Sequence, residues 1–145
     1  MGQAREVMDR LTEALTTQQD PEVIGELFAR DAVAFTPDGG ELHGRDDIVR
    51  YWRQMTGAIP EASYESLHSY EIGNTAIDEG YFSGRNEGPI HLPSGESLPA
   101  TRKEVRVRGV DLATVDENGR IIDYRLYFDE LEFLGQLGLL SEEPS

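Results

Sequence analysis

The residue best suited to chemistry in this 145-residue chain is an aspartate that the sequence places among apolar side chains. Residues 103–115 alternate with a period of two, as side chains do along a β-strand, and one face is apolar except for Asp111. Apolar surroundings disfavour a carboxylate and raise the pKa of its acid, so that it can take up and release protons near neutral pH. Asp111 is therefore either an acid–base catalyst or neutral donor in a pocket, or a buried acid satisfied by Tyr, Arg or backbone groups.

A second acid follows the strand that returns beside the first. Residues 116–119 end in Asn-Gly, which readily adopts the positive φ angles of a hairpin turn. The apolar face of the returning strand consists of Ile122, Tyr124, Leu126 and Phe128. Asp129 comes next and has capping-box spacing to Glu132. We expect Asp129 to be either the N-cap of a short C-terminal helix or a second catalytic acid.

The rest of the chain supplies the elements that position these acids. Apolar residues at helical spacing predict helices over 5–17, from Asp20-Pro21 through Phe28, and over 44–55. Period-two patterns predict strands over 31–36, 63–72 and 75–84, whereas 85–101 has the composition of an irregular loop. Three helices on the concave face of a curved antiparallel sheet of about four to six strands make an α+β fold, in one domain over 1–145. The cavity under such a sheet is a natural small-molecule site.

Composition excludes several classes of function. The formal net charge of −15 argues against nucleic acid or an anionic membrane as a partner, because phosphate binding needs clustered cations. Cysteine is absent, which excludes disulfides and thiolate metal sites, and the three histidines lack metal-ligand spacing, so no metal site is predicted. No apolar run approaches the roughly 20 residues that span a bilayer, and the N-terminus is polar and unlike a signal peptide, so we expect a cytoplasmic location.

The order and spacing of four segments resemble a known family. They are LFARDAVAFTPDGG, HGRDDIVRYW, SGRNEGPIHLPSGESLP and GVDLATVDENGRIIDYRLYFDELEFLGQLGLL. Together they resemble the cone-shaped nuclear-transport-factor-2-like (NTF2-like) fold and, within it, the SnoaL-like polyketide cyclases. The resemblance implies cofactor-independent acid–base chemistry, an aldol cyclisation or isomerisation, on a hydrophobic carbonyl compound, with Asp111 and Asp129 as the catalytic acids. It also implies a homodimer.

The same resemblance indicates which side chains surround the substrate. Phe35 and Trp52 would line the helix side of the cavity, and the strand row of Tyr124, Leu126 and Phe128 would form its apolar wall. His68 shares a predicted strand face with Tyr64, and is either a pocket residue or a packed or interface residue.

The chain also departs from its relatives, which leaves other functions open. Ketosteroid isomerase has a catalytic base where this chain has Thr36 and a phenol donor where it has Leu11, so we do not expect an efficient steroid isomerase. The segment 84–86 reads Gly-Arg-Asn and lacks the histidine often found there. A non-catalytic small-molecule-binding protein is the alternative. An epoxide hydrolase with an Asp–Arg–Asp cluster is a third hypothesis, although strand parity puts Arg108 and Asp111 on opposite faces.

Overall fold

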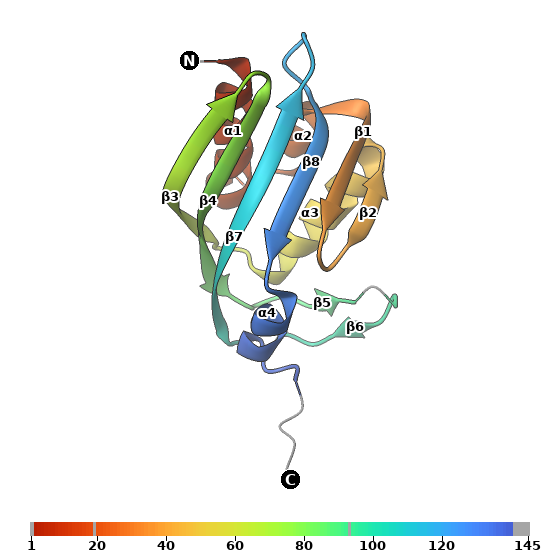
Figure 1. Ribbon diagram of the computed structural model, residues 1–145. Helices are drawn as coiled ribbons and strands as arrows, with labels where there is room; N and C mark the ends of the chain where they lie inside the picture. The colour runs from red at the N-terminus through yellow and green to blue at the C-terminus, as the bar shows by residue number, and fades with distance from the viewer. Residues whose placement is uncertain (1, 19, 93, 141–145) are drawn as a thin grey trace.

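A six-stranded, strongly curved sheet forms one side of the molecule (Figure 1). The computed structural model describes residues 2–18, 20–92 and 94–140. The strands are β1 (Phe28–Thr36), β2 (Gly40–His43), β3 (Ser63–Ile72), β4 (Thr75–Arg85), β7 (Glu104–Val115) and β8 (Ile121–Phe128). They lie in the order β2-β1-β8-β7-β4-β3, and every neighbouring pair is antiparallel except β1 and β8. The predicted α+β class and curved, mainly antiparallel sheet are thus confirmed.

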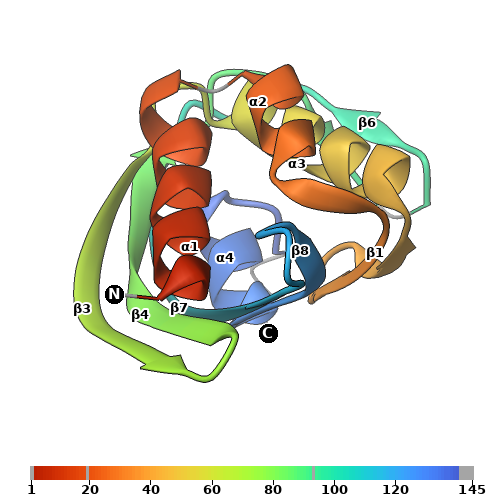
Figure 2. The ribbon, with the colours of Figure 1, turned by 90° about the horizontal axis from the view of Figure 1, so that it is seen from above.

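Three N-terminal helices cover the concave face of this sheet, as the view from above shows (Figure 2). They are α1 (Gln3–Glu13), which continues into the π-helical turn η1 (Ala14–Gln18), α2 (Pro21–Glu26) and α3 (Arg45–Ala58). The short α4 (Glu130–Gln136) and the small hairpin of β5 (Ile90–His91) and β6 (Ser97–Leu98) lie together at one end of the sheet (Figure 1). None of the helices in the described part of the chain is long and apolar enough to cross a membrane.

The second helix ends earlier than its apolar pattern predicts. Asp20 caps it by accepting a hydrogen bond from the Glu22 amide, with Pro21 at the first helical position, as predicted. Phe28, however, belongs to β1, where it pairs with Ile121 of β8. The Arg45 guanidinium also donates two hydrogen bonds to the Phe28 carbonyl, at 3.1 and 2.9 Å. Tertiary pairing therefore overrides the local helical spacing here.

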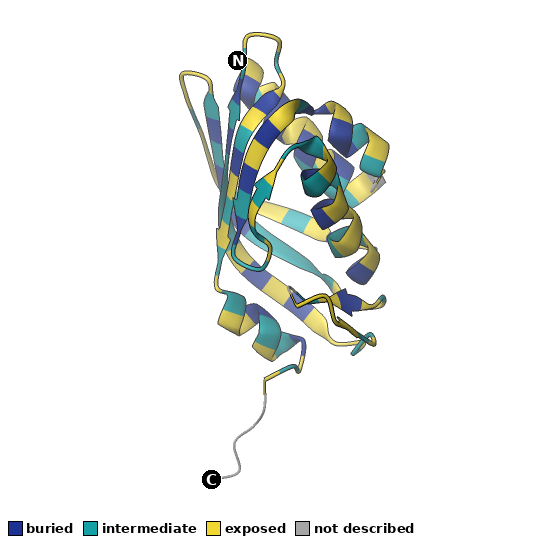
Figure 3. Cartoon of the chain, turned by 90° about the vertical axis from the view of Figure 1, so that its right-hand side faces the viewer, coloured by how far each residue is buried: buried dark blue, intermediate teal, exposed yellow. Residues whose placement is uncertain are grey.

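Burial alternates along the strands, as the period-two patterns predict (Figure 3). The prediction is wrong at the start of β8, where Ile121 is fully buried and Ile122 is 38% exposed. The register of the β7–β8 hairpin shifts between Thr114 and Val115, and this irregularity reverses which of the two isoleucines faces the core. From Tyr124 onward the predicted parity holds. The face that carries Asp111 and Tyr124 consequently points toward the helices.

The core has two parts. The larger cluster lies between α1, α2, α3 and the sheet and includes Met8, Leu11, Ile24 and Tyr124. The second cluster lies around α4, the end of α3 and the start of β7. The two are connected through partly buried Met55, which packs against both. Two cavities that Met55 lines lie near this junction.

Candidate active site

An apolar cavity of about 100 Å³, the inner pocket, lies between the concave face of the sheet and helices α1, α3 and α4. Gly80 of β4 and Gly109 of β7 are directly opposite each other in the sheet and both line it. A side chain at Gly80 would collide with the Tyr64 ring, so Gly80 leaves room for Tyr64 to lie across the sheet. Among the described residues that line the pocket, Asp111 is the only one with a carboxyl group.

The Asp111 carboxyl group has the environment expected of a proton-transfer residue. Burial raises its pKa to about 7, and the nearby Asp78 carboxylate contributes in the same direction. The Tyr124 hydroxyl donates a 2.6 Å hydrogen bond to Asp111 Oδ2, which opposes the shift, and Arg5 opposes it as well. Burial and the Asp111 charge raise the pKa of Tyr124 well above its usual range, so this hydroxyl remains a donor. Asp111 is therefore poised to exchange a proton near neutral pH.

A buried ion pair lies beside Asp111. Asp78 is opposite Asp111 in the β4–β7 register and is only 4% exposed. Arg5 of α1 reaches it, with Nη2 2.8 Å from Asp78 Oδ2, and also contacts Asp9 at 2.8 Å. In the described part of the chain, three buried polar atoms have no hydrogen-bond partner: Arg5 Nη1, Asp78 Oδ1 and the Tyr64 hydroxyl. Buried polar groups without partners are rare, and of these three residues Tyr64 lines the inner pocket, so a polar atom of a ligand or a water there can satisfy its hydroxyl.

The Tyr64 hydroxyl belongs to the same polar cluster. Burial raises the pKa of Tyr64, and Asp111 and Asp78 both add to the shift, which places its hydroxyl near the two acids. Tyr64 therefore stays protonated and can donate a hydrogen bond to an oxygen in the inner pocket.

Aromatic packing holds the Tyr124 side chain in place. The Trp52 ring contacts Tyr124 edge-on, with centroids 5.8 Å apart, and the Phe28 ring also contacts it edge-on, at 6.1 Å. Trp52 in turn packs against Tyr51, whose hydroxyl donates a 2.9 Å hydrogen bond to Asp38. Since each ring restricts the next, the donor to Asp111 is fixed before any ligand arrives.

Comparison with known proteins identifies the family. The model of the SnoaL-like domain matches residues 8–124, most of the chain and all of the sheet up to Tyr124. The chain belongs to the SnoaL-like family. Among curated proteins, none matches the chain significantly.

Solved structures show that this SnoaL-like chain has the NTF2-like fold. A protein described as a SnoaL-like polyketide cyclase from Jannaschia sp. CCS1 is 18% identical, with a TM-score of 0.81, over 96% of this chain and 94% of that one. TsrD from Streptomyces laurentii is 21% identical, with a TM-score of 0.76, over 95% and 96%. An LEH-like epoxide hydrolase from M. tuberculosis is 18% identical, with a TM-score of 0.69, over 94% and 90%. At these identities the likeness concerns the fold alone.

The structure brings most of the predicted site residues of this SnoaL-like protein together. Those that line the inner pocket are Asp111, Trp52, Tyr124, Leu126 and Phe128. The row predicted on β8 thus forms one wall, and the predicted helix residue Trp52 faces it. Their common position follows from strand parity and helical spacing, which is why the sequence could locate them.

Asp129 and Phe35 lie elsewhere. Asp129 is exposed and caps α4 by accepting a 3.1 Å hydrogen bond from the Glu132 amide, the first of its two predicted roles. Phe35 lies on the outer face of the sheet, where its ring packs 5.6 Å from that of Tyr127. Its neighbours Ala34 and Thr36 are the buried residues, so the prediction that Phe35 lines the cavity is wrong by one position of strand parity.

His68 is exposed and stacks against Tyr70, with ring centroids 6.3 Å apart. The predicted pocket position is wrong because the β3–β4 register shifts between Ser66 and His68, which moves the later residues of β3 to the other face. Tyr64, before the shift, is the residue of β3 that reaches the pocket.

Sequence reasoning missed the polar cluster beside Asp111. Asp78 has the same signal as Asp111, a lone acid on the apolar face of a strand between Ala76 and Gly80. Arg5 carries no such signal, because only the packing of α1 on the sheet brings it to Asp78. The Asp–Arg–Asp combination considered from the sequence does not assemble, since Arg108 is exposed and pairs with Glu79 at 2.8 Å.

Two departures from the family pattern have structural roles. Asn86, in the place of the family histidine, is fully buried and donates to the Ala58 and Gly88 carbonyls while accepting from the Thr101 amide. Thr36 accepts a 2.8 Å hydrogen bond from the Gly39 amide.

Among the described residues, no group of three or more His, Cys, Asp or Glu side chains is arranged to hold a metal ion.

Proposed function

We propose that this SnoaL-like protein is an enzyme that carries out cofactor-independent acid–base chemistry, an aldol cyclisation or an isomerisation, on a hydrophobic carbonyl compound in the inner pocket. The observation that carries the proposal is the position of Asp111, a carboxyl group that lines a mainly apolar cavity and accepts a hydrogen bond from Tyr124, where burial raises its pKa to about 7. A pKa close to the working pH suits a residue that takes a proton and later returns it.

In the proposed reaction, ionised Asp111 removes a proton from the carbon next to the substrate carbonyl. This step leaves an enolate and a neutral Asp111. The Tyr64 hydroxyl, which lacks a partner in the described chain, donates a hydrogen bond to the enolate oxygen. In a cyclisation, the enolate carbon attacks a second carbonyl of the same molecule, a carbon–carbon bond forms, and Asp111 returns the proton to the new alkoxide. In an isomerisation, the proton goes to a different carbon.

The test is a screen of wild-type protein and Asp111→Asn against steroids, anthraquinone esters, terpenoid epoxides and fatty acids. A ligand at a hundredfold its dissociation constant stabilises the folded state by about 2.7 kcal/mol, which a thermal-shift assay detects. Hits are then incubated in deuterated water. Deuterium at the carbon next to the carbonyl, formed by wild type and not by Asp111→Asn, is the expected result. A bound carbonyl compound without exchange would contradict the proposed chemistry and favour a binding protein.

A second candidate is hydrolysis of an epoxide. One observation favours it: the structure does gather two aspartates and an arginine, namely Asp111, Asp78 and Arg5, around unsatisfied polar atoms. In that reaction an ionised carboxylate removes a proton from water, the water oxygen attacks an epoxide carbon as the carbon–oxygen bond breaks, and a protonated carboxyl group gives its proton to the epoxide oxygen, so that a diol forms. The terpenoid epoxides in the same screen test it, since ¹⁸O from labelled water must appear in the diol.

We further propose that two copies associate through the outer face of the sheet. Val33 and Tyr127 are 37% and 45% exposed there, beside the Phe35 ring, and the neighbouring strand adds Val110 and Leu112. Sedimentation equilibrium is expected to give a dimer for wild type and a monomer for Tyr127→Glu, which puts like charges into the centre of the contact. A wild-type monomer at micromolar concentration would contradict this proposal.

A further inference from the structure

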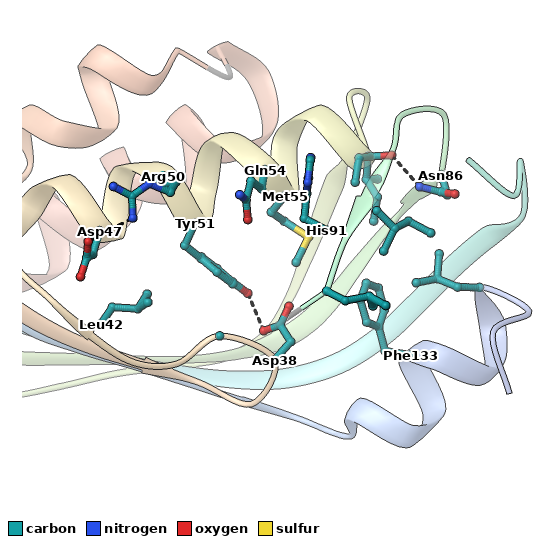
Figure 4. A pocket seen from close by; sticks show the side chains of 16 residues that line it. Asp38, Leu42, Asp47, Arg50, Tyr51, Gln54, Met55, Asn86, His91 and Phe133 are labelled. Atoms are coloured by element: carbon teal, nitrogen blue, oxygen red, sulfur yellow. Dashed lines mark hydrogen bonds and ion pairs between the residues drawn. The ribbon is translucent and has the colours of Figure 1, made fainter. Parts of the chain in front are cut away.

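A second cavity, the outer pocket, has a volume of about 370 Å³ and lies between α3, the β1–β2 turn, β5 and α4 (Figure 4). This volume falls within the range of about 300–1,000 Å³ typical of small-molecule sites, which the inner pocket alone does not reach. Its deeper wall is apolar and includes Ile59, Ile90 and Leu137. Tyr51, Met55 and Phe133 line both pockets, so the two cavities are neighbours separated by these side chains. The outer pocket is thus large enough and apolar enough to hold part of an organic molecule.

Asp38 presents a carboxylate to this apolar space. Figure 4 shows the Asp38 and Tyr51 side chains pointing toward one another, and the Tyr51 hydroxyl donates to Asp38 Oδ1 at 2.9 Å. Asp38 Oδ2 accepts no hydrogen bond and makes no ion pair with any residue that the structure describes. One oxygen is therefore held in position by a buried tyrosine while the other is available to a ligand.

The charges around Asp38 favour a cation. Among the described lining residues Arg50 is the one arginine or lysine, and its Nη1 is already 3.2 Å from Asp47 Oδ1. His91 also lines the pocket, and its Nδ1 is 3.0 Å from the Ser97 hydroxyl. Glu130, at the start of α4, has a raised pKa because of partial burial and of the Asp38 charge, which places a second acid near the first. The protein as a whole has a net charge of −15, which attracts cations and repels anions.

We propose that the outer pocket is a binding site for an amphipathic organic amine, with the protonated amine on Asp38 Oδ2 and the apolar body against Ile59, Ile90 and Phe133. The site is distinct from the polar end of the inner pocket, and its occupation does not depend on the reaction proposed for Asp111. A molecule long enough to pass Met55 reaches both cavities, so the outer pocket also selects among substrates that carry a basic substituent.

The experiment uses the full chain with ¹³C-labelled isoleucine δ1 methyl groups. Ile59 and Ile90 line the outer pocket and no isoleucine lines the inner pocket, whereas Ile24 and Ile121 are buried in the core. The probes are 4-phenylbutylamine, 4-phenylbutanol and 4-phenylbutyrate, which share one apolar body and differ in charge. Titration of the amine is expected to shift the Ile59 and Ile90 methyl signals and to leave those of the two core isoleucines in place. The amine is expected to bind about tenfold more tightly than the alcohol, and the carboxylate more weakly than either.

Two variants separate a specific contact from general attraction. Asp38→Asn is expected to bind the amine about as weakly as the alcohol, and Asp46→Asn, an exposed acid on α3 outside this pocket, to bind it like wild type. If Asp38→Asn does not fold, Glu130→Gln is expected to weaken amine binding in the same direction. Asp111→Asn should keep the amine preference, so failure of the proposed reaction does not affect this result. Equal losses in Asp38→Asn and Asp46→Asn, or shifts confined to other methyl groups, would overturn the proposal.

Discussion

The Asp111→Asn variant is expected to be more stable than wild type at about pH 8, and its advantage is expected to shrink as the pH falls toward 5. The folded-state pKa of Asp111 is about 7, whereas an unfolded aspartate titrates near 3.8. Between these two values the folded state binds more protons than the unfolded state, so wild-type stability falls as the pH rises. Above about pH 7, burial of the ionised Asp111 carboxylate lowers the free energy of unfolding by its full amount, about 4 kcal/mol for a pKa difference of roughly three units. Asparagine has no charge to bury and can still accept the hydrogen bond from Tyr124.

Urea unfolding at several pH values measures this effect. The free energy of unfolding of Asp111→Asn minus that of wild type is expected to increase by about 2–3 kcal/mol between pH 5 and 8. Asp31→Asn is the matched control, because Asp31 is an exposed residue of β1 and its replacement changes the net charge equally. If the difference in free energy of unfolding does not vary with pH, or varies as much for Asp31→Asn as for Asp111→Asn, burial of the Asp111 charge does not destabilise the protein.

The same variant is expected to lose turnover while gaining stability. Removing a general acid–base group typically lowers the rate by about 10²–10⁴-fold. In wild type, the rate of proton abstraction is expected to rise with pH through about 7, as Asp111 becomes ionised. Gain of stability together with loss of activity is the behaviour of a residue kept for function, since a structural acid would lose stability on replacement.

Strand parity explains how much of the site the sequence could predict. Asp111, Tyr124, Leu126 and Phe128 were located because they belong to uninterrupted alternating runs of β7 and β8. The errors at Ile122 and His68 occur where the register shifts, and one extra residue moves the rest of a strand to the other face. Phe35 was misplaced because β1 buries the polar residue Thr36, and the neighbouring Phe35 therefore lies on the opposite face of the strand.

Contacts between distant elements were beyond the sequence patterns. The buried ion pair beside Asp111 depends on α1 packing over β4, which brings together Arg5 and Asp78 from positions 73 residues apart. The outer pocket depends likewise on α3, α4 and the β5–β6 hairpin converging at one end of the sheet. Helix and strand periodicities determine which face of an element is buried, but they contain no information about which faces meet.

Arg5→Leu is expected to be the most destabilising of the single changes considered for this protein. It leaves Asp78, 4% exposed, as a buried carboxylate without its cation, and such losses cost about 3–5 kcal/mol. The backbone amide of Arg5, which donates to Glu71 at 3.0 Å, is unaffected by the change. Loss of the arginine also removes a charge that lowers the pKa of Asp111, so the pH dependence of turnover is expected to move to higher pH.

The double variant Arg5→Leu, Asp78→Leu separates charge from packing. If the cost of Arg5→Leu comes from the uncompensated Asp78 charge, replacing both partners by leucine should recover most of the lost stability in urea unfolding. The single Asp78→Leu change should cost less than Arg5→Leu, because the arginine keeps Asp9 as a partner. A double variant as unstable as Arg5→Leu would instead mean that the arginine stabilises α1 through its packing. The double variant can also recover its stability while its turnover keeps a pH dependence different from that of wild type. In that case the ion pair is not needed for stability, and its role is to set the pKa of Asp111.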